Sequence, residues 1–281
     1  MLKVIVFDLD GTLYEDTHHF DYYAKRIAER LEKEKQALFW QDYHAVLAGV
    51  HPLKIGSVYN AKEDVILFLD SDHYVYAVYE WDGTKWSDDA IQKHYPKQIS
   101  VDLDNMLSIG DLWWVPSTIG RHYGLTNEET YAAFLETRTF MMSPHFTMKR
   151  TAGLAELLTQ LREHLFFVLM TNSPKLDSEA ILAKLGLADI FHQKIFQAGK
   201  PVHTAKHLQE LCQTFNVRYE EIMSIGDNWR NDILPAKQLG CQTIYIDPHE
   251  TGVNADITVR SVGEMVQLLS TYIKSERVSK K

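Results

Sequence analysis

Short apolar runs alternate with amphipathic segments along most of the chain. The first run, residues 1–9, is rich in Val and Ile and too short for a helix, so it predicts a buried strand. Further strands are expected at 165–170, 221–225, 242–246 and 256–259. Between them, apolar residues three and four positions apart predict helices at 174–185, 202–215, 231–239 and 262–273. This alternation predicts an α/β fold, in which helices cover both faces of a parallel, Rossmann-like sheet.

Residues 17–149 break this alternation. A charged segment at 20–38 has the pattern of a helix. It is followed by Tyr- and Trp-rich segments at 65–69 and 74–81, whose alternating pattern predicts a small β-meander. We therefore expect an inserted domain that is helical and has a β-rich middle.

A helix start is predicted after the aromatic segments. Thr126, with Glu129 three residues later, is typical of a capped helix N-terminus. The chain would then return to helix before the second part of the parallel sheet begins. We expect two domains: a core made of residues 1–16 and 150–281, and an insertion at residues 17–149.

Composition and charge exclude several classes of protein. With 281 residues, of which 45% are apolar, the chain can bury a large core without a metal or a disulfide. The net charge of -9 disfavours binding to a nucleic-acid polymer. The longest purely apolar run, 165–170, is too short to cross a membrane, and the N-terminus lacks the pattern of a signal peptide. We expect a cytoplasmic protein that does not bind membranes, and the composition leaves the oligomeric state open.

Asp8 and Asp10 form the first candidate site. They stand two residues apart at the end of the first predicted strand, and Gly11 and Thr12 follow them. Because side chains alternate along a strand, both carboxylates point to one side. Two adjacent carboxylates repel each other unless a metal ion or a shared proton neutralises them. Taken alone, the pair is equally compatible with a metal site and with two side chains that cap a turn.

Thr171 opens a second candidate site, in the sequence TNSP after the strand at 165–170. Ser173 suits a helix N-cap and Pro174 the first helical position. The free N–H groups of the helix start would then lie beside the Thr171 hydroxyl and the Asn172 amide. This arrangement predicts an anion-binding turn, and an ordinary turn between a strand and a helix is the alternative.

Two later loops complete the set of candidates. Lys200 lies in the loop sequence AGKP, and Asp227 follows the strand at 221–225 in the sequence GDNWRND, which also contains Asp232. Open α/β sheets place ligands at the carboxyl ends of their strands. We therefore expect five side chains to converge on one site: Asp8, Asp10, Thr171, Lys200 and Asp227.

Together, the segments FDLDGTLY, TNS, GKP and GDNWRND resemble the four motifs of the haloacid dehalogenase superfamily of phosphohydrolases. The resemblance covers residues 1–14 and about 149–273. Residues 17–149 correspond in position to the first type of cap domain in that superfamily. The resemblance implies a Mg²⁺-dependent phosphatase that hydrolyses a small-molecule phosphomonoester through an aspartyl-phosphate intermediate.

The resemblance also implies a role for each motif residue. Asp8 would be the nucleophile, and Asp10 would protonate the leaving oxygen and then activate water. The Asp8 side chain, the Asp10 main-chain carbonyl and Asp227 would hold Mg²⁺, with Asp232 close by. Thr171 and Lys200 would bind the transferring phosphoryl group. The remaining substrate or phosphate contacts would be Gly11, Thr12, Asn172 and Tyr14, and Arg121 and Arg138 of the insertion are further candidates for specificity.

Several alternatives stay open within this resemblance. Asp10 favours a phosphatase over a dehalogenase, because a halide leaves without needing a proton. A phosphomutase and a sugar-phosphate or phosphoglycolate phosphatase use the same fold, and a phospho-aspartate binding switch is the alternative that is not an enzyme. The segment FDLDGTLY also resembles the pyrimidine 5′-nucleotidase-like branch, which makes a nucleoside 5′-monophosphate the first substrate to consider. The long, β-rich insertion departs from the pattern of that branch.

Overall fold

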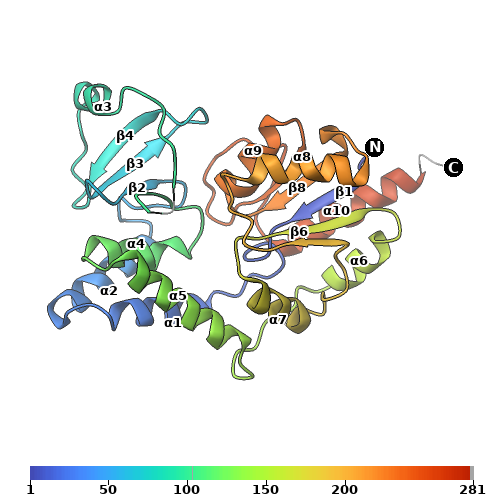
Figure 1. The fold of residues 1–281 in the computed structure, drawn as a ribbon, viewed down its shortest axis with the longest axis horizontal. Coiled ribbons are helices and arrows are strands. Elements are labelled where there is room, and N and C mark those ends of the chain that lie inside the picture. Colours follow the sequence, from blue (N-terminus) through green and yellow to red (C-terminus); the bar gives the residue numbers. More distant parts are fainter. Residues whose placement is uncertain (103, 279–281) are drawn as a thin grey trace. The chain divides into compact units, whose positions relative to one another are not determined.

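The structure, a computed structural model, describes residues 1–102 and 104–278 (Figure 1). The chain divides into two compact units. Unit 1 consists of Met1–Asp16 and Met141–Lys281, and unit 2 consists of Thr17–Phe140. Within the described residues, no helix is both long enough and apolar enough to cross a membrane.

Unit 1 is built on a six-stranded sheet with the strand order β10-β9-β8-β1-β6-β7, in which all neighbours are parallel. Its strands are β1 (Val4–Phe7), β6 (Phe166–Met170), β7 (Gln193–Ile195), β8 (Ile222–Gly226), β9 (Gln242–Ile246) and β10 (Ile257–Val259). The predicted parallel sheet is therefore confirmed. Strand β7 was not predicted, because its sequence QKI at the sheet edge is half-buried and contains no apolar run.

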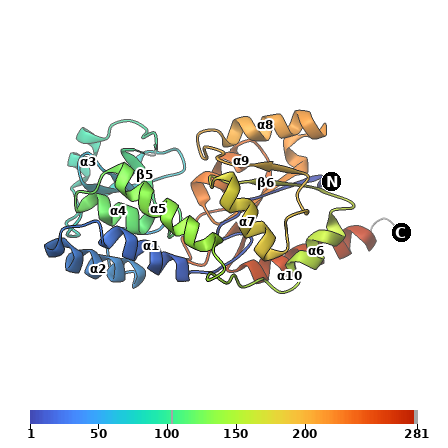
Figure 2. The same ribbon diagram turned by 60° about the horizontal axis from the view of Figure 1, so that its bottom comes forward.

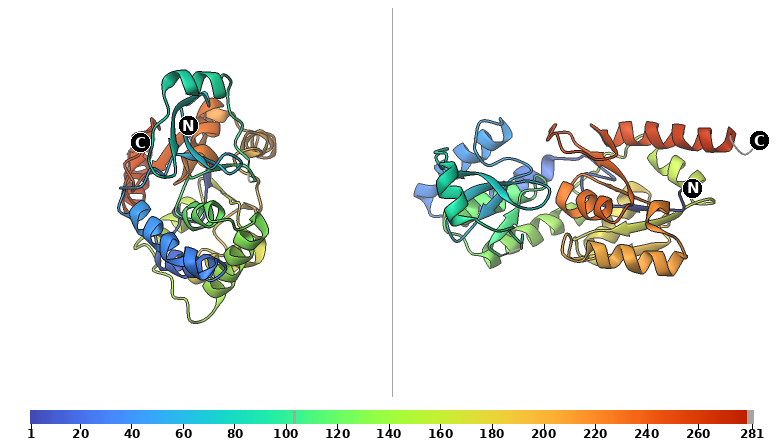
Figure 3. Two further views of the ribbon diagram at one scale, coloured as in Figure 1. Left: turned by 90° about the vertical axis from the view of Figure 1, so that its left-hand side faces the viewer. Right: turned by 90° about the horizontal axis from the view of Figure 1, so that it is seen from above.

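Helices cover both faces of this sheet, as the sequence predicts. They are α6 (Leu154–Leu161), α7 (Lys175–Leu185), α8 (Thr204–Phe215), α9 (Leu234–Gln238) and α10 (Val262–Val278), with a 3₁₀ turn at Tyr219–Glu221. Figures 2 and 3 show α8 on one side of the sheet and α6 and α10 on the other. Val4 and Val6 of β1 pack in one cluster with Leu208 of α8. The centre of the Phe7 ring lies 5.6 Å from the centre of the Phe167 ring. Burial on both faces explains why the strands are continuously apolar.

The predicted helix at 231–239 is interrupted at its start. A π-helical turn, Trp229–Ile233, precedes α9, and the Asn228 side chain accepts a hydrogen bond from the Asn231 N–H at 3.2 Å. The Ser224 hydroxyl donates to the Asp232 carbonyl at 2.8 Å. These contacts hold Asp232 directly beside the end of β8.

Unit 2 contains the predicted β-meander within a four-stranded antiparallel sheet of order β4-β3-β2-β5. The strands are β2 (Val58–Asn60), β3 (Val65–Leu69), β4 (Val75–Glu80) and β5 (Met106–Ser108). The alternation in β3 sends Val65 and Leu67 to one apolar cluster and Ile66 to another, so both faces of the sheet are covered. Strands β2 and β5 were not predicted, since three residues are too few to show a period.

The helices of unit 2 are α1 (His18–Ala28), α2 (Lys33–Leu47), α3 (Asp88–His94), α4 (Trp114–His122) and α5 (Asn127–Met142). The prediction of one helix at 20–38 is wrong, because the chain turns between α1 and α2. Glu32 has an extended backbone (φ -55°, ψ 146°), and Leu31 is buried in the core of unit 2. Burial of Leu31 favours two short helices over one long amphipathic helix.

The last two residues of α5 and the segment that follows it belong to unit 1. The Lys184 side chain of α7 donates to the carbonyl oxygens of Met141, Ser143 and Phe146 at 2.6, 2.7 and 2.8 Å. These three hydrogen bonds attach the segment to unit 1. Unit 2 consequently ends at Phe140, before residue 149 at which the insertion was expected to end.

The capping box at the start of α5 gives a test of local stability. The Thr126 hydroxyl accepts from the Glu129 N–H at 3.2 Å, and the Glu129 carboxylate accepts from the Thr126 N–H at 2.8 Å. Thr126→Ala should lower the free energy of unfolding by about 1 kcal/mol, because it leaves helix N–H groups without this acceptor. Urea denaturation followed by circular dichroism measures the change. Thr139→Ala, in the interior of the same helix, is the control, and an equal loss in both variants would contradict the capping role.

Candidate active site

Four neighbouring strands of unit 1 end at the same edge of the sheet. In the parallel register, Phe7 of β1 pairs with Leu169 of β6 and with Ile225 of β8. The next residues along these strands therefore bring Asp8, Thr171 and Asp227 to one edge, and the loop after β7 carries Lys200. The strand order reverses at β1, which is where open α/β sheets bind ligands.

A buried lysine lies between two of the carboxylates. Lys200 is only 4% exposed, and its Nζ lies 2.8 Å from Asp8 Oδ1 and 2.5 Å from Asp232 Oδ1. Burial raises the pKa of Asp8 to about 7; the charge of Lys200 opposes this shift, whereas the charges of Asp232 and Asp10 add to it. Burial alone would lower the pKa of Lys200, but the two carboxylates raise it above its ordinary value. Lys200 is therefore held as a cation against Asp8.

Three carboxylates fit a divalent cation. Asp8, Asp227 and Asp232 each offer an oxygen atom, and these atoms all lie within 4.8 Å of one another. Oxygen ligands of this kind suit Mg²⁺. A Cβ atom at Gly11, where φ is +73°, would lie 2.0 Å from Asp227 Oδ2, so only glycine allows this approach. A role for the Asp10 main-chain carbonyl as a metal ligand stays a prediction.

Asp10 is held by two hydroxyl groups. The buried Tyr14 hydroxyl donates to Asp10 Oδ1, and the Ser173 hydroxyl donates to Asp10 Oδ2 at 2.8 Å. Ser173 was predicted as a helix N-cap, and that prediction is wrong. The N-cap of α7 is Pro174, and the Ser173 hydroxyl is directed to Asp10 instead. Sequence reasoning did not identify Ser173 as a site residue, although its place beside Thr171 was a usable signal.

The loop after β6 is tied to the loop that carries Lys200. The Asn172 side chain donates to the Lys200 carbonyl at 3.0 Å and accepts from the Lys200 N–H at 2.8 Å. Thr171 is buried, and its hydroxyl oxygen accepts from the Ser173 N–H at 3.1 Å. Thr12 is fully buried in the turn after Asp10. Direct phosphate contacts by Thr12, Thr171 and Asn172 stay predictions.

The two arginines considered for specificity lie in unit 2. Arg121 donates to the Asn127 side chain at 3.2 Å and to the Asp104 carbonyl at 3.0 Å. Arg138 is 2% exposed, and its guanidinium carbon lies 5.4 Å from the centre of the Trp113 ring. Arg121 thus contacts other residues of unit 2, and the Arg138 guanidinium lies over the Trp113 ring; the roles of both arginines in specificity stay predictions.

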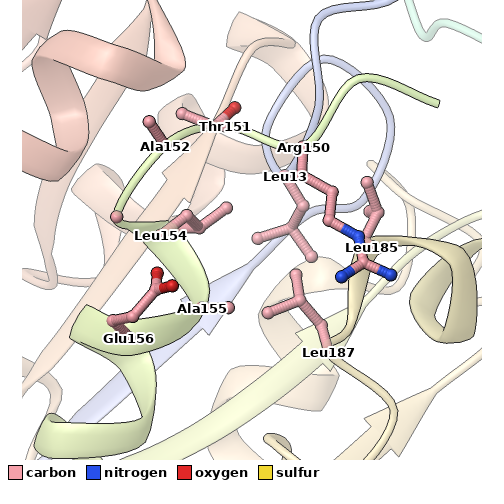
Figure 4. A pocket seen from close by; sticks show the side chains of 10 residues that line it. Leu13, Arg150, Thr151, Ala152, Leu154, Ala155, Glu156, Leu185 and Leu187 are labelled. Carbon is pink, nitrogen blue, oxygen red and sulfur yellow. The ribbon is translucent and has the colours of Figure 1, made fainter.

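A separate pocket lies beside the turn that follows Asp10 (Figure 4). It is lined by residues 150–156 together with Leu13, Leu185 and Leu187. None of the site carboxylates lines it. Its contribution to the site is indirect, because the buried Leu13 anchors the turn that carries Asp10 and Tyr14.

Removal of the buried cation should destabilise unit 1. In Lys200→Met, Asp8 and Asp232 lose their cationic partner inside the protein, and we expect the free energy of unfolding to fall by about 3 kcal/mol in buffer containing EDTA. Urea denaturation measures this loss. Lys206→Met removes an exposed lysine from α8 and should change stability by less than about 0.5 kcal/mol. Equal stabilities of the two variants would show that Lys200 does not balance the buried carboxylates.

Comparisons with known proteins find a family model that matches part of the chain and solved structures that share its fold. A family model for haloacid dehalogenase-like hydrolases matches residues 146–240. YfnB from Bacillus subtilis, a HAD-hydrolase bound to magnesium, has a TM-score of 0.53 at 14% identity, over 96% of this chain and 99% of that chain. The haloacid dehalogenase-like family protein SP0104 from Streptococcus pneumoniae has a TM-score of 0.51 at 13% identity, over 95% and 98% of the two chains. A search of curated proteins found no match.

The matched region contains Thr171, Lys200 and Asp227, which represent three of the four motifs. At such low sequence identity, the two solved structures establish the fold alone. The family match over residues 146–240 confirms the resemblance to the haloacid dehalogenase-like hydrolases for that part of the chain, and the two solved structures share the fold of the whole chain.

Proposed function

We propose that the chain is a Mg²⁺-dependent phosphatase, which hydrolyses a small phosphomonoester with Asp8 as its nucleophile. One observation carries the proposal: the buried Lys200 contacts Asp8 where the oxygen atoms of three carboxylates gather at the carboxyl edge of the sheet. A cation beside Asp8 offsets the repulsion between that carboxylate and an incoming phosphate dianion. Asp10, two residues away, supplies the proton donor that an ester leaving group requires and a halide does not.

The reaction runs in two steps. A carboxylate oxygen of Asp8 forms a bond to phosphorus while the bond between phosphorus and the ester oxygen breaks, and Asp10 gives its proton to that oxygen, which leaves as an alcohol. Water then attacks phosphorus, Asp10 takes a proton from the water, and the bond from phosphorus to Asp8 breaks. Inorganic phosphate leaves, and both aspartates return to their starting states.

The other residues of the site bind and orient the phosphoryl group. The Lys200 ammonium group faces Asp8 and can contact a phosphoryl oxygen held there. Thr171, at the end of the adjacent strand β6, would add a hydroxyl donor. Asn172 keeps the Lys200 loop in place through its two hydrogen bonds to the Lys200 main chain. The geometry thus favours positioning and charge stabilisation of the transferring group.

The residues that would hold Mg²⁺ are Asp8, Asp227 and Asp232. The ion would offset the charge of these carboxylates and of the phosphoryl oxygens. Asp232 contacts Lys200 as well, so the protein cation and the metal ion would share the same carboxylate cluster.

For the substrate, a nucleoside 5′-monophosphate comes first, because the segment FDLDGTLY resembles the pyrimidine 5′-nucleotidase-like branch. The site in unit 1 presents carboxylates, hydroxyl groups and a lysine, which suit a phosphoryl group and a cation.

Asp8→Asn should abolish phosphate release from every substrate, since an amide cannot form the aspartyl-phosphate. The assay is Mg²⁺-dependent release of inorganic phosphate from UMP, CMP, phosphoglycolate and glucose 6-phosphate. The wild type should show its highest kcat/KM on the nucleotides. Asp72→Asn, at an exposed turn of unit 2, is the control and should remain active. A wild-type protein that releases no phosphate from a broad panel of phosphomonoesters would refute the proposed function.

Asp10→Asn should reduce turnover by roughly 10²- to 10⁴-fold, the usual contribution of a general acid or base. The amide keeps the size of the side chain but cannot donate and then accept the transferred proton. Steady-state kinetics on the best substrate, together with Mg²⁺ titration by calorimetry, separates this effect from a loss of metal binding. Near-normal turnover in Asp10→Asn would overturn the proton-transfer role.

A further inference from the structure

We propose that Tyr14 and Ser173 are positioning residues, which hold the Asp10 carboxyl group in the orientation required for proton transfer. The inference rests on the proposed function, because it assigns to these residues the placement of the group that transfers the proton. It gives Tyr14 a place inside the site, whereas the sequence suggested a contact with substrate.

The first hydroxyl donor comes from the turn that also contains Asp10. The N–H groups of Thr12 and Leu13 donate to the Leu9 carbonyl at 3.4 and 3.0 Å, so the chain folds back immediately after Asp10. This turn brings the Tyr14 hydroxyl onto Asp10 Oδ1. Tyr14 is 1% exposed, and the neighbouring Leu13 is fully buried and lines the pocket with Leu185 and Leu187 (Figure 4). The Tyr14 ring therefore has little freedom to move.

The second donor comes from a distant part of the sequence. Ser173 is 163 residues from Asp10 and lies in the loop after β6. Its N–H group donates to the Thr171 hydroxyl oxygen at 3.1 Å, and its own hydroxyl donates to Asp10 Oδ2 at 2.8 Å. Ser173 is 7% exposed. Two separate loops thus hold the two oxygens of one carboxyl group.

This arrangement fixes the plane of the Asp10 carboxyl group. A carboxyl group can rotate about its Cβ–Cγ bond, and one hydrogen bond to each oxygen restricts that rotation. Proton transfer requires the donor within hydrogen-bond reach of the ester oxygen, and a loosely held group satisfies that geometry less often.

A comparison of leaving groups detects this role directly. The value of kcat/KM reports the steps up to release of the alcohol, which include proton donation by Asp10. Phenyl phosphate has a basic leaving group and depends on that proton, whereas p-nitrophenyl phosphate releases a stable anion and depends on it little. Both esters are assayed with the full-length protein and Mg²⁺.

In Tyr14→Phe, kcat/KM for phenyl phosphate should fall about tenfold, part of the full contribution of a general acid. The value for p-nitrophenyl phosphate should stay within about twofold of the wild type. Ser173→Ala should likewise lower the ratio of kcat/KM for phenyl phosphate to kcat/KM for p-nitrophenyl phosphate. Ser173→Thr, which keeps a hydroxyl group, should restore this ratio. If Tyr14→Phe does not fold, the kcat/KM values of the two Ser173 variants on the two esters suffice for the test.

Matched controls remove the same kind of group elsewhere. Tyr59 is a buried tyrosine of unit 2 whose hydroxyl donates to Asp64 at 2.6 Å, so Tyr59→Phe loses an equivalent hydrogen bond to a carboxylate. Ser178→Ala removes a buried hydroxyl that donates to the Pro174 carbonyl at 2.7 Å. Neither control should change the ratio between the two esters.

Three outcomes would overturn the inference. An equal loss on both esters would assign Tyr14 and Ser173 a purely structural role. An increase in KM for both esters with kcat unchanged would indicate a contact with substrate. Unchanged kinetics in both variants would remove any role in positioning. A wild-type protein that hydrolyses neither these esters nor a broader panel would instead contradict the proposed function itself.

Discussion

A buried lysine holds together carboxylates that would otherwise repel one another. Lys200 contacts Asp8 and Asp232, and Asp227 approaches the same place across Gly11. Charges of one sign at this spacing are tolerated inside a protein when a cation or a shared proton balances them. Gly226 also makes room for the cluster. A side chain at this position would clash, because its Cβ atom would lie 2.4 Å from the Asp232 side chain. The architecture of the site follows from this need for charge balance and close approach.

The parallel sheet satisfies this need with little additional structure. Strands β8, β1, β6 and β7 are neighbours, and the loops that follow them carry Asp227, Asp8, Thr171 and Lys200. Each strand sets the position at which its loop begins. Hydrogen bonds between loops, such as that between Asn172 and Lys200, then hold the loops in place. A rigid frame that delivers charged groups from several loops is suited to a reaction in which positioning and electrostatics provide most of the rate.

Much of this arrangement could be predicted from the sequence. Short apolar runs identify the buried strands, and the polar residues that follow them identify Asp8, Thr171 and Asp227. Strand β7 escaped prediction because an edge strand of sequence QKI has no apolar pattern. The role of Ser173 was not predicted, because helix capping depends on neighbouring residues, whereas the contact of Ser173 with Asp10 joins residues 163 positions apart. The break between α1 and α2 depends on where Leu31 packs, which periodicity alone does not determine.

The most direct test of the account is the covalent state of Asp8 during turnover. The wild-type protein is mixed with Mg²⁺ and its best substrate, quenched in acid within milliseconds, digested and analysed by mass spectrometry. If Asp8 is the nucleophile, the peptide containing Asp8 gains one phosphoryl group, fragmentation places that group on Asp8, and a chase without substrate removes it. Steady release of phosphate, with that peptide unmodified at every quench time, would contradict the account.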